Sequence, residues 1–227
     1  MTPDLARLTW TDVPDRPLAL VPLGSFEQHG PHLPLDTDTR IADAVAHAVA
    51  ERLPGEVVVA PPVVYAASGE HQGFPGTVSI GNEALKFVLI ELVRSMALWS
   101  GRVVFLNGHG GNATCLADAL RELSAEGQDV AHVQCFPPGG DAHAGHTETS
   151  LMLHLAPELV HMDRAWRGNP TPIRELMPAL VAGGVAAVSA SGVLGDPTTA
   201  TGEEGARLFD ALVAEVTARL QTEETRR

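Results

Sequence analysis

The chain has 227 residues, of which 44% are hydrophobic and 19% charged, and its net charge is −13. This length suits one fairly large domain over 1–227, whose core is big enough to fold without disulfide staples. The negative charge repels phosphate backbones, and no apolar run approaches the roughly 20 residues that cross a bilayer. Segment 1–15 contains acids and lacks the apolar centre of a signal peptide. We therefore expect a cytoplasmic protein that binds neither nucleic acid nor membrane.

Apolar periodicity and helix breakers predict alternating strands and helices in the first half of the chain. The predicted strands are 18–23, 57–60 and 102–106, and the predicted helices that follow them are 38–53, 82–100 and 113–126. Asn82 is the expected N-cap of the second helix. Glycines and a proline interrupt the segment 68–81, which is therefore predicted to be a loop.

The second half of the chain continues this alternation less regularly. It contains a predicted strand at 130–135, a short helix at 147–155, an irregular stretch at 166–178, a further strand within 185–193 and an amphipathic helix at 202–220. The two cysteines, Cys115 and Cys135, have the spacing of neither a zinc ribbon nor a disulfide framework. We expect both to be small buried apolar residues in a reducing environment.

Strands that alternate with helices predict an α/β fold with a mostly parallel sheet and helices on both of its faces. In such folds the ligand crevice lies at the carboxyl ends of the strands. Three unusual loops, 24–37, 107–112 and 136–147, directly follow predicted strands. We therefore expect these loops to converge at one edge of the sheet.

The first loop contains two histidines and three acids, namely Glu27, His29, His32, Asp36 and Asp38. Glu27 and His29 are two residues apart, so in an extended segment both side chains project to one side. Carboxylate and imidazole together suit Zn²⁺, Mn²⁺ or Fe²⁺. The alternative is a solvated polar loop in which Asp38 caps the following helix.

The second loop places His109 between glycines, which allow tight turns and close approach of a ligand. A phosphate cradle is an alternative for this loop, but it matches no nucleotide-binding fingerprint and contains no basic residue. The third loop supplies His143, His146 and Glu148. Glu148 falls in the first turn of a predicted helix, where the helix dipole alone would favour a carboxylate.

The three loops together argue for metal binding more strongly than any one alone. Histidines and carboxylates gather on loops that the topology brings to one edge, which is typical of a metal centre. The candidates outnumber the ligands that one tetrahedral catalytic ion needs. They suit a two-metal site in which one carboxylate bridges ions about 3.5–4 Å apart.

Several motifs resemble one known family over nearly the whole chain. They are Gly24-Ser-Phe-Glu-Gln-His-Gly-Pro-His32 with Asp38, Asn107-Gly-His-Gly-Gly-Asn112 and His143-Ala-Gly-His-Thr-Glu-Thr-Ser150. The chain therefore resembles the creatininase-family amidohydrolases. Further stretches resemble the branch of this family that serves mycofactocin biosynthesis, among them Leu33-Pro-Leu-Asp-Thr-Asp-Thr-Arg-Ile-Ala42, Ala67-Ser-Gly-Glu-His-Gln72 and Gly192-Val-Leu-Gly-Asp-Pro-Thr-Thr-Ala-Thr201.

The resemblance implies a metal site and roles for its residues. By this resemblance the metal ligands are Glu27, His29, Asp38 and His109, with Asp38 as the bridge, and Glu148 completes the site. The resemblance also implies that His143 handles a proton. Glu148 is the second catalytic candidate. Two positions depart from the pattern of true creatininases, namely Gly111, where those enzymes carry a ligating glutamate, and Gly139, where they carry an aromatic lid residue. Creatinine is therefore not the expected substrate. Glu70, His71 and Gln72 are candidates for lining the pocket, with a solvated loop as the alternative.

The resemblance implies a metal-dependent peptidase with two divalent ions per subunit, either Fe²⁺, Zn²⁺ or Mn²⁺. Its expected partner is a small modified precursor peptide, from which it would release a modified C-terminal Val-Tyr dipeptide. The family also implies a homo-oligomer such as a hexamer. One alternative is hydrolysis of a small cyclic amide or formamide, and another is a metal-binding or nucleotide-binding protein without catalysis.

Overall fold

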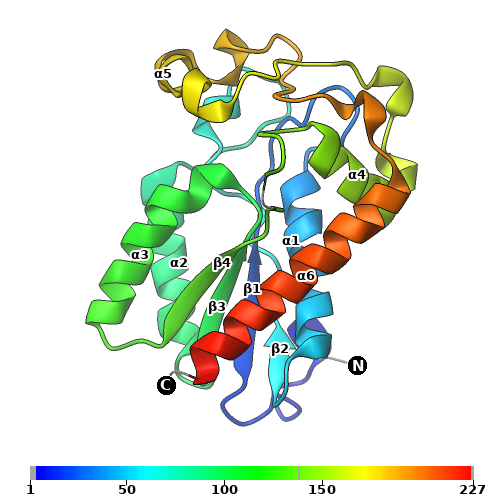
Figure 1. Cartoon of the computed structure of the whole chain (residues 1–227). Helices are drawn as coiled ribbons and strands as arrows, with labels where there is room; N and C mark the ends of the chain where they lie inside the picture. The colour runs from blue at the N-terminus through cyan, green and yellow to red at the C-terminus, as the bar shows by residue number, and fades with distance from the viewer. Residues whose placement is uncertain (1–3, 138, 226–227) are drawn as a thin grey trace.

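The computed structural model describes residues 4–137 and 139–225 and contains a four-stranded parallel sheet (Figure 1). Its strands are β1 (Leu18–Leu23), β2 (Val57–Val59), β3 (Arg102–Asn107) and β4 (Val130–Gln134). They lie in the order β2-β1-β3-β4, and every neighbouring pair is parallel. The central strands β1 and β3 are apolar over nearly all their length, as expected of strands covered on both faces.

Helices cover both faces of the sheet, which confirms the predicted α/β class. One face carries α1 (Thr37–Arg52), α4 (His146–Leu155) and α6 (Gly202–Thr225), and the other carries α2 (Asn82–Met96) and α3 (Ala113–Ala125). Alternation along β1 divides its side chains between the two cores. Leu20 packs under α1 and α6, whereas Ala19 and Val21 pack under α2 and α3.

The segment that follows α4 differs most from its sequence-based description. Residues 173–183 form the helix α5 (Ile173–Gly183), although 166–178 was predicted to be irregular. No strand forms within 185–193, where the short helix η6 (Val185–Ala187) is followed by a turn. Gly184 has a φ of +68°, a left-handed conformation that suits glycine and ends α5. Figure 1 shows α5 beyond the ends of the strands, apart from the helices that cover the sheet.

Smaller differences concern helix ends. The N-cap of α2 is Gly81, and Asn82 is the first helical residue, so the predicted cap was wrong by one position. The same helix ends at Met96 rather than at residue 100, and α6 continues to Thr225. Both cysteines are buried and free, as predicted, and burial raises the pKa of the Cys135 thiol to about 12. Among the described residues, no helix has the length and apolar character needed to cross a membrane.

Candidate metal centre

All four strands lead into the site, which lies at their carboxyl ends. The loop after β1 carries Glu27 and His29, and the loop after β3 carries His109. A close approach brings Asp38, in the first turn of α1, against the end of β3. A Cβ added to Gly108 would lie 2.5 Å from the backbone oxygen of Asp38, so only glycine leaves room there.

Asp38 lies between two histidines. Its Oδ1 is 3.0 Å from Nε2 of His29, and its Oδ2 is 3.2 Å from Nδ1 of His109. Ser25 donates a hydrogen bond of 2.8 Å to Oδ2 and so fixes the orientation of the carboxylate. A carboxylate that presents one oxygen to each of two imidazoles is placed to share two ions.

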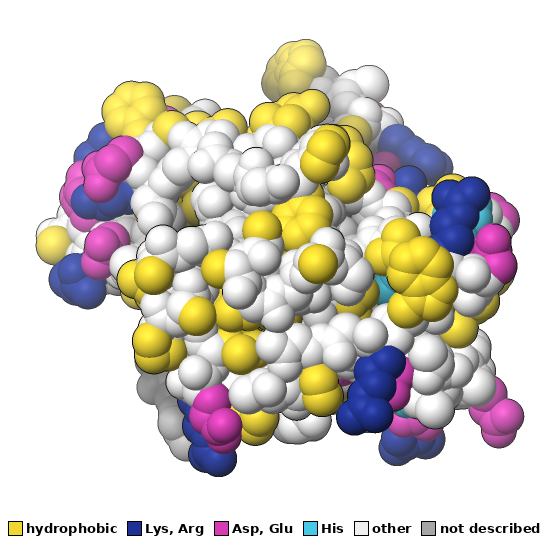
Figure 2. Space-filling model, turned by 90° about the horizontal axis from the view of Figure 1, so that it is seen from above, with side chains coloured by type: hydrophobic (Ala, Val, Ile, Leu, Met, Phe, Trp, Pro, Cys, Tyr) yellow, Lys and Arg dark blue, Asp and Glu magenta, His cyan; other side chains and the backbone are white. Residues whose placement is uncertain are grey.

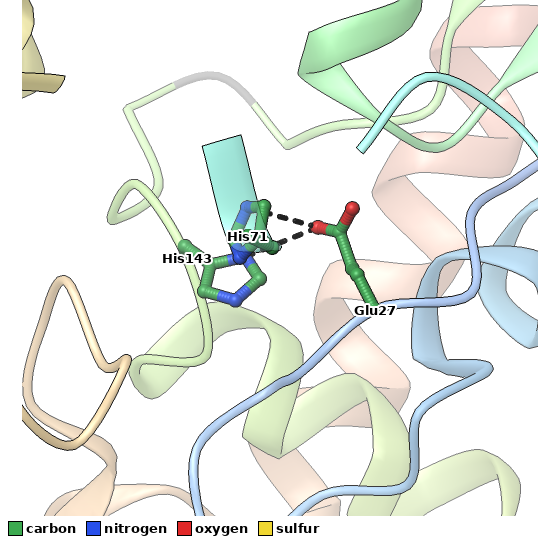
Figure 3. Close-up of side chains that lie close together, drawn as sticks. All are labelled: Glu27, His71 and His143. Atoms are coloured by element: carbon green, nitrogen blue, oxygen red, sulfur yellow. Dashed lines mark ion pairs between the residues drawn. The ribbon is translucent and has the colours of Figure 1, made fainter. Parts of the chain in front are cut away.

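Glu27 is fully buried, and neither of its carboxylate oxygens accepts a hydrogen bond from any described residue. Its Oε2 lies 3.2 Å from Nε2 of His109. Its Oε1 lies 3.2 Å from Nε2 of His71 and 3.8 Å from Nδ1 of His143 (Figure 3). A buried carboxylate is costly unless a positive charge compensates it, and a metal ion held by these side chains would supply that charge.

Glu148 closes the opposite side of the cluster. It lies in the first turn of α4, accepts a hydrogen bond from the backbone N–H of Ala144, and approaches Nε2 of His29 to 4.0 Å. Three sets of side chains lie close enough together for each to hold one ion. They are Glu27 with Asp38 and His109, His29 with His143 and Glu148, and Glu27 with His71 and His143.

The protonation states of these groups also fit a site for cations. Burial lowers the pKa of both His29 and His109, but the facing carboxylates outweigh it and raise the pKa of each to about 10. Burial raises the pKa of Glu27 and of Glu148 to about 7. The cluster therefore holds protons tightly, and divalent ions would displace them on binding.

His143 has a different environment. Burial, reinforced by the nearby His29, holds its pKa well below the usual range, so the imidazole is neutral. Its Nε2 lies 2.8 Å from the backbone oxygen of Gln28, which can only accept, and 3.0 Å from the side-chain amide nitrogen of Gln28, which can only donate. In the tautomer that donates to this carbonyl, Nδ1 is unprotonated, and Nδ1 faces Glu27. His143 also lines a cavity of about 560 Å³ beside the cluster.

The comparisons with known proteins agree with this geometry. The family model for creatininase, described as creatinine amidohydrolase, matches residues 6–220. The chain belongs to the creatininase family. It is 57% identical over 211 residues to the mycofactocin precursor peptide peptidase of Mycobacterium ulcerans (strain Agy99), and the match covers 90% of this chain and 84% of that protein.

Solved creatininase structures share the fold over almost the whole chain. A creatininase in which one tryptophan is replaced by alanine has a TM-score of 0.81 and 29% identity, covering 98% of this chain and 99% of its own. A Zn-Zn form of a mutant creatininase has a TM-score of 0.79 and 28% identity, covering 98% of this chain and 98% of its own. A Mn form has a TM-score of 0.79 and 27% identity, covering 98% of this chain and 99% of its own. Creatininases that share this fold therefore bind divalent metals.

The structure brings together every residue predicted to form the site, namely Glu27, His29, Asp38, His109, His143 and Glu148. Three other polar residues of the same loops lie outside the cluster. His32 contacts Oγ1 of Thr149 and burial lowers its pKa to about 4, Asp36 pairs with Arg40, and His146 contacts Thr199.

His71 is the member of the cluster that sequence reasoning left open. It lies in η2 (Gly69–His71), in the long loop after β2, and it stacks near His143 at 4.4 Å between ring centroids. Burial lowers its pKa to about 3. The rule that placed the other ligands, namely position after a strand, applies to this loop as well. Of the pocket candidates, Glu70 and His71 line the cavity, and Gln72 is exposed.

The space above Gly111 is occupied by the carboxylate of Glu70. A Cβ added to Gly111 would lie 2.4 Å from Oε1 of Glu70 and 2.4 Å from Nε2 of His109. Glu70 itself approaches Nε2 of His109 to 3.5 Å. A carboxylate from a different loop therefore fills the place in which a side chain at position 111 would stand.

Proposed function

We propose that this chain hydrolyses an amide bond near the C-terminus of a modified mycofactocin precursor peptide and releases the modified Val-Tyr dipeptide. The single observation that supports this most is the 57% identity to a mycofactocin precursor peptide peptidase, over 90% of the chain. The buried cluster of histidines and carboxylates supports the hydrolytic chemistry independently.

In this proposal two divalent ions, Fe²⁺, Zn²⁺ or Mn²⁺, are held by Glu27, His29, Asp38, His109 and Glu148. Asp38 would help to hold both ions, because its two oxygens face His109 and His29. The chemistry that such ions would supply is activation of water near neutral pH and polarisation of the amide carbonyl. The ligand chemistry admits all three metals, so metal analysis has to decide among them.

The chain's own residues handle the proton. The neutral His143 presents Nδ1 toward Glu27 on the cavity side of the cluster, where it can take a proton from water and give it to the leaving amine. The contacts of Nε2 with the backbone and side chain of Gln28 fix the plane of the ring. Glu148 is the second candidate, because burial raises its pKa to about 7 and it can carry a proton at neutral pH.

Mass spectrometry of the metal-loaded protein with modified precursor tests the proposal. We expect one new product with the mass of the modified dipeptide, and we expect none after treatment with a chelator. Intact precursor under conditions in which a small cyclic amide or formamide is hydrolysed would favour the alternative substrate class. Absence of hydrolysis of every substrate by the metal-loaded wild type, with no change in any assay on His29→Ala, would favour a non-catalytic protein.

A cytoplasmic location and a homo-oligomer such as a hexamer stay predictions. The molar mass in solution, measured by light scattering, tests the assembly.

A further inference from the structure

The cavity beside the metal centre has two unlike ends. The polar end is the cluster itself. The opposite wall is made of apolar side chains from α5, from η6 and from the residue that follows Cys135. These residues, called here the apolar wall, are Phe136, Ile173, Met177, Leu180, Val181 and Val185.

The side chains that α5 contributes to this wall are not used by the core. In α5, all of which the structure describes, Leu176 alone is buried. Ile173, Met177 and Val181 follow one another at a spacing of four residues and therefore share a helix face, yet they are 43%, 46% and 80% exposed. A helix normally turns its apolar face inward, so an open apolar face beside a cavity indicates a ligand with apolar groups.

The charges around the cavity argue against an anionic occupant of this wall. Among the described residues that line the cavity there is no lysine or arginine, whereas Asp38, Glu70, Asp141 and Glu148 are all acidic. Figure 2 views the molecule from the end that carries α5. Lysine, arginine, aspartate and glutamate side chains lie toward the margins of this face, and hydrophobic and uncharged surface fills its centre.

The end of α5 contacts the segment that carries part of the metal centre. A Cβ on Gly184, which follows α5, would lie 2.6 Å from the backbone oxygen of Glu70, so the end of the helix packs directly on η2. From η2, Glu70 reaches His109 and His71 reaches Glu27. A substrate whose amide lies at the cluster can therefore contact the apolar wall with the groups next to that amide.

We infer that the apolar wall is a binding subsite for the bulky apolar side chains of the segment that the enzyme releases. This inference rests on the proposed function, because it takes the Val-Tyr segment as the occupant. Valine and tyrosine side chains offer the apolar area that such a wall can cover, and an aromatic ring alone buries about 150–250 Å². The wall would thus select this segment by apolar contact, while the metal centre selects the amide.

The test is the affinity of the Zn²⁺-loaded protein for Val-Tyr amide, measured by isothermal titration calorimetry without turnover. The variant Met177→Ser/Leu180→Ser removes two wall side chains, and we expect it to weaken binding about tenfold or more. Leu98→Ser is the matched control, because Leu98 is 87% exposed and lies at the opposite end of the sheet, just before β3. The control should bind as the wild type does.

Equal affinity of the wild type and the double variant, or no binding to the wild type at millimolar peptide, would overturn the inference. The single variant Met177→Ser changes a half-exposed side chain and keeps the test valid if the double variant folds poorly. Cleavage of the precursor by the double variant with wild-type KM would sink the subsite while leaving the proposed function intact. Wall-dependent binding of Val-Tyr amide without cleavage of the precursor would uphold the subsite and contradict the proposed function.

Discussion

At the scale of single residues, the site depends on close approaches that two glycines allow and on the burial of one acid, Glu27. Gly108 allows Asp38 to reach His109, and Gly111 leaves room for the carboxylate of Glu70. Glu27 has no hydrogen-bond donor among the described residues, although it is fully buried. Burial of the Glu27 carboxylate lowers the stability of the protein without ions, and bound cations would compensate this cost.

The role assigned to His143 can be separated from metal binding. We expect His143→Gln to lower kcat about 100-fold or more, since general acid–base catalysis typically contributes that much. The substitution should leave in place the one ion that Glu27, Asp38 and His109 would hold, since His143 is not a member of that set. Steady-state kinetics and metal analysis of the same sample check both parts. Loss of that ion from the variant would show that His143 is a structural ligand instead.

At the scale of elements, the sheet and the site were largely predictable. Apolar runs in the sequence predict the strands and their alternation with helices. The rule that the carboxyl ends of parallel strands lie at one edge of the sheet correctly predicts that Glu27, Asp38, His109 and Glu148 lie close together. The helix α5 was not predictable, because Pro178 within it is a helix breaker and its apolar face meets a cavity rather than a sheet. Contacts with η2 and η6 hold it instead.

The valines and alanines of 185–193 are apolar, which indicates a strand, and no local signal shows that this run lies beyond the sheet. The segment that carries His71 begins ten residues after β2, where polar residues alone resemble a solvated loop. Only the tertiary fold, which places η2 against His109, distinguishes these cases.

The packing of α2 on the sheet predicts a specific loss of stability. Leu89 is fully buried in the core beneath α2 and α3. We expect Leu89→Ala to lower the free energy of unfolding by about 2–5 kcal/mol through lost burial and a residual cavity. Leu98→Ala, just beyond the same helix and 87% exposed, should change it by less than about 0.5 kcal/mol. Urea unfolding followed by circular dichroism measures both, and similar values for the two variants would contradict this packing.

At the scale of the whole molecule, an acidic protein concentrates buried titratable groups at one end of its sheet. In the absence of metal, the folded state binds protons at His29 and His109 with a pKa of about 10, against about 6.5 for an unfolded histidine. This contribution to stability is complete below about pH 6.5 and is lost as the pH rises toward about 10. Glu27 and Glu148, with pKa values raised to about 7, change stability in the same direction between about pH 4.5 and 7.

We therefore expect protein in a chelating buffer to be less stable toward urea at pH 9.5 than at pH 7. Excess Zn²⁺ should remove or reverse this trend, because the ion replaces the protons and binds better as the ligands lose them. Unfolding midpoints at the two pH values, with and without metal, provide the comparison. A chelated protein that gains stability over this range would contradict the assigned proton binding.

The central claim is that Glu27, His29, Asp38, His109 and Glu148 hold divalent ions together. The most direct measurement is the metal content of protein stripped with a chelator, reloaded with Zn²⁺ and separated from free metal before elemental analysis. We predict two ions per chain for the wild type and for His146→Ala, whose side chain lies outside the cluster, and less than one for Asp38→Asn. Wild-type metal content in Asp38→Asn, or no bound metal in the wild type, would contradict the account.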